Sequence, residues 1–191
     1  MKKLTLTAAM LLTPTVAFAH AGHGATSSLF AGLVHPLSGI DHLTVMLTVG
    51  ALAACKGGRA LWLWPAAFVG VMIAGAVLGM MRVPLPLVEP AILASVVVLG
   101  MLMALAVNLP TWLGVTLVGF AALFHGSAHG AEAEIYGGTG YMLGFIVTTA
   151  VLHLTGIGAV LALRSLSLQP LIRVAGAASA LIGVGLTFHI I

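Results

Sequence analysis

The sequence predicts an all-α integral membrane protein, a bundle of six transmembrane helices that follows a cleavable N-terminal signal peptide. Hydrophobic residues make up 61% of the 191 residues and charged residues only 6%, whereas about a quarter of an ordinary soluble domain is charged. Six apolar segments follow one another, and the breaks between them are short and rich in Gly, Pro or charge. The chain has too little polar surface to be a soluble domain.

Residues 1–19 have the pattern of a secretory signal peptide. Lys2 and Lys3 precede an apolar stretch that ends in a small-x-small pattern at Ala17 to Ala19. Cleavage after Ala19 leaves residues 20–191 as a single six-helix transmembrane domain. Such a leader is typical of a multi-pass protein of the bacterial inner membrane, so we expect the mature N-terminus to face the periplasm.

The positions of the basic residues agree with this orientation. With the mature N-terminus outside, Lys56, Arg59, Arg164 and Arg173 fall in cytoplasmic breaks, and Arg82 is the one basic residue of the mature chain on the periplasmic side. The predicted spans, each close to the roughly 20 residues that a helix needs to cross a bilayer, are 29–54, 61–80, 87–107, 111–129, 139–163 and 171–190.

The first span contains the stretch "HPLSGIDH", with three ionisable groups in eight residues. On an unbroken helix His35 and His42 would lie about 10.5 Å apart, too far to share one ion. Pro36 removes a backbone donor and Gly39 permits bending, so the span is predicted to be broken at Pro36/Gly39. Inserting the charged Asp41 side chain into the membrane costs about 3 kcal/mol of free energy. A bound cation would offset this cost.

A second motif, "FHGSAHGAE", lies at residues 124–132. His125 and His129 are spaced i, i+4 and therefore lie on one face of a helix, and Glu132 joins them if the helix persists. The small residues between them predict close helix packing, as does "GAVLG" at residues 75–79.

Imidazole and carboxylate together suit nickel, zinc, copper(II) and cobalt, so the side chains predict a divalent transition metal without selecting one. No permanently bound cofactor is predicted. The candidate metal ligands are His35, Asp41, His42, His125, His129 and Glu132, with His20, His23 and His153 as a second group.

Three ionisable residues have simpler interpretations. Glu89, next to Pro90 at the predicted start of a helix, fits a cap or a partner of the helix dipole. His189 fits an anchor at the membrane surface. For His153, near the bilayer centre, a hydrogen bond to a neighbouring helix explains the residue as well as metal binding does.

These motifs resemble the HupE/UreJ family, the membrane accessory proteins found with hydrogenase and urease systems. "HPLSGIDHLTVMLTVG" (35–50) follows the family signature H-P-x-x-G-x-D-H-x-x-x-M-x-x-V-G at every fixed position, and "FHGSAHGAE", "YMLGF" and "LHLTG" are similar to family features. The resemblance covers essentially the whole mature chain. It implies a permease, not an enzyme, that carries Ni²⁺ (or Co²⁺) as its substrate and supplies the maturation of nickel metalloenzymes. It also implies transport roles for the residues of both motifs.

Other functions stay open on the residues alone. An intramembrane zinc-dependent hydrolase could use the histidines, Asp41 and either Ser38 or Ser127 to hold zinc and activate water. A bis-histidine haem protein would need axial ligands that face one another. The chain has no phosphate-binding Gly-rich loop, so the predicted transport is secondary or channel-like. The expected partners are the metal ion and the lipid bilayer, with no nucleic acid, and homo-oligomer formation is left open.

Overall fold

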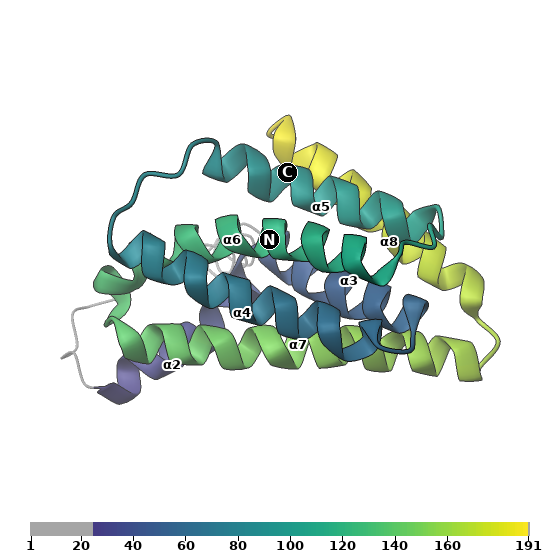
Figure 1. The fold of residues 1–191 in the computed structure, drawn as a ribbon, viewed down its shortest axis with the longest axis horizontal. Coiled ribbons are helices and arrows are strands. Elements are labelled where there is room, and N and C mark those ends of the chain that lie inside the picture. The colour runs from purple at the N-terminus through teal and green to yellow at the C-terminus, as the bar shows by residue number, and fades with distance from the viewer. Residues whose placement is uncertain (1–24, 191) are drawn as a thin grey trace, which may run out of the picture.

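The computed structural model describes residues 25–190, which form seven helices and no strand (Figure 1). Four of these helices are long and apolar enough to cross a membrane, or five if the bent pair α2 and α3 counts as one span, so the chain is a multi-pass membrane protein. The helices are α2 (Ala25–Ser38), α3 (Ile40–Lys56), α4 (Ala60–Met80), α5 (Val88–Ala104), α6 (Thr111–Tyr136), α7 (Thr139–Ser165) and α8 (Gln169–Thr187).

Each of the six predicted segments is helical, but not all of them are long enough to count as a span. Helix α5 has 17 residues, or about 26 Å of length, which is less than the roughly 30 Å of a hydrocarbon core. The six-span count therefore stays a prediction. The predicted signal peptide and the candidates His20 and His23 lie outside the described residues.

Helix α6 is longer than predicted. The sequence interpretation placed a break after residue 129, whereas the helix continues to Tyr136. The reason is that the Ala-Glu-Ala-Glu run at residues 131–134 consists of strong helix formers. The helix ends at Gly137 and Gly138, whose φ angles of 101° and 68° are the left-handed values that glycine adopts readily.

Small residues bring α4 and α6 into close contact, as the sequence predicted. Gly75 and Gly79 of α4 lie against the backbone of α6, and Gly126 and Gly130 of α6 lie against the backbone of α4. A Cβ atom at any of these four positions would overlap the opposing main chain. The two helices run in the same direction, and their contact is of the small-xxx-small kind.

The remaining helices form two further pairs around α3. Helix α5 packs antiparallel to α8, with Gly100 against Gly176. Helix α7 packs parallel to both α2 and α3. Helix α3 also contacts α4, α5 and α8, so it lies in the centre of the bundle (Figure 1). These relative directions fit a chain whose predicted segments cross the membrane alternately.

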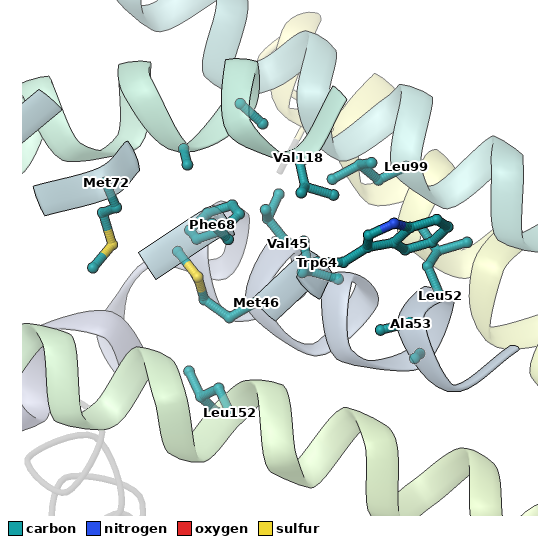
Figure 2. Close-up of a cluster of buried hydrophobic side chains, with 14 of the residues drawn as sticks. Val45, Met46, Leu52, Ala53, Trp64, Phe68, Met72, Leu99, Val118 and Leu152 are labelled. Carbon is teal, nitrogen blue, oxygen red and sulfur yellow. The ribbon is translucent and has the colours of Figure 1, made fainter. Parts of the chain in front are cut away.

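The packed interior is apolar along much of α3. Val45 and Met46 of α3 and Phe68 and Met72 of α4 are fully buried, and Figure 2 draws them in one cluster with side chains of α5, α6 and α7. The outer faces expose large apolar side chains, among them Leu181 at 70%. This distribution is expected of a bundle whose outer surface meets lipid.

The two ends of the bundle carry different polar groups. The imidazole end, defined by His35, His129 and Glu132, is described below. The basic end has a cavity of about 440 Å³ lined by Lys56, Arg164 and Arg173, among others. Both arginines donate hydrogen bonds to carbonyl groups at helix C-termini, those of α3 and α5 respectively, where cations are favoured.

Candidate metal centre

The candidate site is built on a broken helix. Helices α2 and α3 meet at an angle of 82°, and the break is at Gly39, whose φ of −94° and ψ of 118° are extended. Pro36 lies one turn before it, inside α2. The break turns the start of α3 away from the axis of α2. As a result, His35 of α2 and His42 of α3 both contact His129 of α6, from different directions.

Asp41 fixes the orientation of His42. One carboxylate oxygen, Oδ1, accepts the backbone N–H of His42 at 2.8 Å and lies 3.0 Å from the ring Nδ1 of His42. Since an ionised carboxylate can only accept, the proton of the neutral ring is on Nδ1 and the lone pair is on Nε2. Asp41 is also in the first turn of α3, where the helix dipole favours negative charge.

The hydrogen-bond chain continues to α6. The Nε2 atoms of His42 and His129 lie within hydrogen-bond distance of each other. Because His42 has its lone pair there, His129 donates its Nε2–H and has its own lone pair on Nδ1, 3.2 Å from the hydroxyl of Tyr141. The chain Asp41–His42–His129 therefore sets the tautomer of the last ring, as carboxylates set the tautomer of metal-bound histidines elsewhere.

The Nδ1 lone pair of His129, which the hydroxyl of Tyr141 also approaches, lies close to a carboxylate. This Nδ1 lies 3.3 Å from Oε2 of Glu132, and Nε2 of His35 lies 3.4 Å from the same oxygen. One ligand atom from each of His35, His129 and Glu132 falls within 4.8 Å of the others. Two imidazoles and one carboxylate at this spacing can coordinate one divalent transition metal, and water or another protein group would complete the coordination.

His125 lies behind this group, one helical turn before His129. Its ring is fully buried and its centroid is 4.5 Å from that of His42. Ser95 of α5 donates its hydroxyl to the carbonyl of Ile92 at 2.6 Å, so it accepts from Nε2–H of His125 at 3.0 Å. The Nδ1 lone pair of His125 has no hydrogen-bond partner among the described residues.

The two motifs that converge here also identify the family. The HupE / UreJ protein family profile matches residues 8–186 of this chain. The chain belongs to the HupE/UreJ family. It is 45% identical to Protein HupE of Rhizobium leguminosarum bv. viciae over 185 residues, which cover 96% of each chain. No solved structure gives a significant match.

This HupE/UreJ chain thus brings together all six of the principal candidates. One ion can be shared directly by His35, His129 and Glu132. Asp41 orients the ring of His42, which in turn hydrogen-bonds His129. The ring of His125 packs against that of His42. His153 lies apart from this cluster, deeper in α7. Sequence reasoning missed two residues that contact these rings: Ser95 accepts from His125 and so sets its tautomer, and the hydroxyl of Tyr141 lies 3.2 Å from Nδ1 of His129. Both come from other helices, and nothing in a single sequence pairs them with those rings.

A cavity of about 420 Å³ lies beside Asp41. Its lining includes Asp41, Glu89 and His189. Glu89 lies in the first turn of α5, as predicted, where the helix dipole favours negative charge. The sequence interpretations of Glu89 and His189 did not include this shared cavity.

The family assignment gives no support to a hydrolase, and the packing of the histidines gives none to a bis-histidine haem protein. Ser38 donates its hydroxyl to the carbonyl of His35 at 2.6 Å, so it is engaged within its own helical turn. In the cluster, the centroid of His42 is 4.2 Å from that of His129 and 4.5 Å from that of His125. Rings in such close contact leave no room for a porphyrin between them.

Proposed function

We propose that the chain is a permease for a divalent transition metal ion, nickel or cobalt, and that it supplies the maturation of hydrogenase or urease. The observation that carries the proposal is the grouping of His35, His129 and Glu132 within 4.8 Å at a break in a helix of a multi-pass bundle. Discontinuous helices are where membrane transporters place their ion sites.

Charge balance supports a divalent cation. Asp41 and Glu132 are the carboxylates of the cluster, and its histidines can be neutral. A metal ion of charge +2 would therefore leave the cluster close to neutral, which matters because uncompensated charge inside a membrane is costly. Neutral imidazoles are also strong ligands for nickel and cobalt, so they can replace the waters that the ion loses on entry.

In the proposed orientation the imidazole end faces the periplasm and the basic end faces the cytoplasm, in accordance with the positive-inside rule. An ion would approach through the cavity beside Asp41 or directly at Glu132, which is 45% exposed. A membrane potential that is negative inside favours inward movement by about 2.3 kcal/mol per elementary charge for each 100 mV. Uptake of a divalent ion therefore needs no nucleotide.

The test is uptake by the purified protein in proteoliposomes, with radioactive nickel, cobalt and zinc added outside under an inward-negative potential. Wild-type vesicles should accumulate nickel or cobalt above protein-free vesicles. Asp41→Asn and His42→Ala should abolish uptake and still insert, because each breaks the chain that holds the lone pair of His129 toward Glu132. Wild-type rates in both variants, or no uptake by the wild type, would contradict the proposal.

A further inference from the structure

One buried imidazole is not used by the candidate metal centre. His153 lies at the middle of α7, 1% exposed, and neither ring nitrogen has a hydrogen-bond partner among the described residues. Its backbone lies against Gly50 of α3, so α3 and α7 are in direct contact at this level. Measured along α7, it is 12 residues past Tyr141, or about 18 Å, toward the basic end.

A purely structural histidine should be hydrogen-bonded. The other buried histidines are: His125 pairs with Ser95, and His129 pairs with Tyr141 and His42. A buried polar group without a hydrogen-bond partner destabilises the folded protein. The hydrogen bond to a neighbouring helix that would explain His153 as a structural residue is not present, so its nitrogens are available for another ligand.

One aromatic ring, that of Phe68, packs against both His125 and His153. The centroid of Phe68 lies 6.0 Å from that of His125 and 5.1 Å from that of His153. Among the described residues, Nδ1 of His125 and both ring nitrogens of His153 have no hydrogen-bond partner. The two buried imidazoles with unpartnered nitrogens thus pack against the same phenylalanine ring.

The surroundings of His153 are suited to weak, brief coordination. Thr149, one turn earlier on α7, is fully buried, and its hydroxyl donates to the thioether of Met72 at 3.8 Å. Hydroxyl and thioether are neutral donors, in contrast to the carboxylates of the outer cluster. Conduction requires sites that bind well enough to admit an ion and weakly enough to release it, and a neutral inner site meets the second requirement.

We infer that His153 is a second, inner metal-binding position, which receives the ion after it leaves the outer cluster and passes Phe68. This inference rests on the proposed function, because it names the next ligand on the same path. It assigns His153 a role in translocation and none in the initial capture of the ion.

The experiment separates capture from translocation. His153→Phe keeps an aromatic ring and removes both nitrogens, His153→Asn keeps a polar group, and Leu152→Ala perturbs the neighbouring buried position of α7 without touching a ligand. Nickel affinity is measured by calorimetry in detergent, and nickel uptake in proteoliposomes. We expect His153→Phe and His153→Asn to keep the affinity of the outer site within about two-fold and to lose roughly 10- to 100-fold in uptake, while Leu152→Ala transports.

Three outcomes would overturn the inference: wild-type uptake in His153→Phe or His153→Asn, an equal loss of uptake in Leu152→Ala, or a loss of outer-site affinity in the His153 variants. If His153→Phe does not fold, the Asn variant decides. Failure of the proposed function has a different signature, since in that case the wild-type protein moves no nickel at all. If the wild type transports and Asp41→Asn does not, but the His153 variants behave as wild type, the inner position alone is refuted.

Discussion

Two glutamates, two residues apart on α6, have different surroundings. Oε2 of Glu132 lies within 3.4 Å of nitrogens of His35 and His129. The carboxylate of Glu134 instead accepts from Arg82 at 2.7 Å, and both of these side chains are mostly exposed. Exposed ion pairs contribute only about 0–1 kcal/mol. The two residues therefore form a matched pair in which one is a candidate ligand and the other is a solvated charge.

Glu132→Gln should lower nickel affinity by roughly 10- to 100-fold, a typical cost for the loss of a group from a metal site. The amide keeps the shape of the side chain but removes the negative charge and most of its ability to coordinate. Glu134→Gln should bind nickel as the wild type does. Calorimetric titration of the three proteins measures this. Equal losses in both variants would indicate a general electrostatic effect of the helix end and would argue against coordination by Glu132.

Sequence reasoning identified the candidate ligands but not the contacts between them. The i, i+4 spacing of His125 and His129 was enough to place both on one face of a helix, and the signature around His35 pointed to the first span. The hydrogen bond between His42 of α3 and His129 of α6 joins two helices that are far apart in the sequence. A helical period says nothing about which neighbouring helix a face will meet.

At the scale of an element, the break at Gly39 decides how α3 presents its first turn. The φ of Gly39 is −94°, so other residues could adopt this backbone. The restriction is steric, because a Cβ atom at this position would lie 2.8 Å from Oδ1 of Asp41 and 3.4 Å from Nδ1 of His42. The absence of a side chain at Gly39 leaves room for the Asp41–His42 pair.

Gly39→Ala should therefore displace Asp41 from His42 and reduce nickel uptake by about ten-fold or more, as expected when a group that orients a metal ligand is disturbed. Gly70→Ala is the control, since a Cβ atom at Gly70 of α4 meets no atom within 4 Å. Uptake assays on both variants, normalised to the amount of inserted protein, test the expectation. A Gly39→Ala protein with normal uptake would mean that the pair tolerates the added methyl group.

The contact between α4 and α6 allows a prediction about stability. A Cβ atom at Gly126 would overlap the carbonyl group of Met72, whereas a Cβ atom at Gly119 of the same helix would make an ordinary contact at 3.5 Å with Val71. Overpacking typically costs about 1–3 kcal/mol. Gly126→Ala should lower the thermal unfolding temperature in detergent, and Gly119→Ala should leave it unchanged or raise it slightly, because alanine favours the helix.

The elements themselves were largely predictable, because apolar segments of about 20 residues separated by Gly, Pro and charge identify membrane helices well. The error at the end of α6 has a physical cause. Glycine and charge were taken as signs of a break after residue 129, but Gly130 packs against α4 and the following Ala-Glu run favours helix. This extension carries Glu132 on the same helix as His129, so the correction strengthens the candidate site.

At the scale of the whole molecule, the charges of the described residues differ between the two ends, although Arg82 lies at the imidazole end in an ion pair with Glu134. Carboxylates and imidazoles collect at one end of the bundle, and Lys56, Arg164 and Arg173 surround the cavity at the other. This separation gives the bundle a direction. If the basic end faces the cytoplasm, a transported cation would enter at the imidazole end, whose side chains can bind it. It would leave past the basic residues, whose positive charges cannot bind a cation.

The orientation can be tested with single cysteines. The native Cys55 is the one cysteine of the chain, so Cys55→Ser gives a cysteine-free background. Into it we would place Glu134→Cys at the imidazole end or Arg59→Cys at the basic end, both at exposed positions. A membrane-impermeant maleimide that reaches the periplasm should label the Glu134→Cys protein in intact cells, and the Arg59→Cys protein only after the inner membrane is permeabilised. The reverse pattern would place the metal centre on the cytoplasmic side and would turn the proposed uptake into export, because the outer cluster would then receive ions from inside the cell.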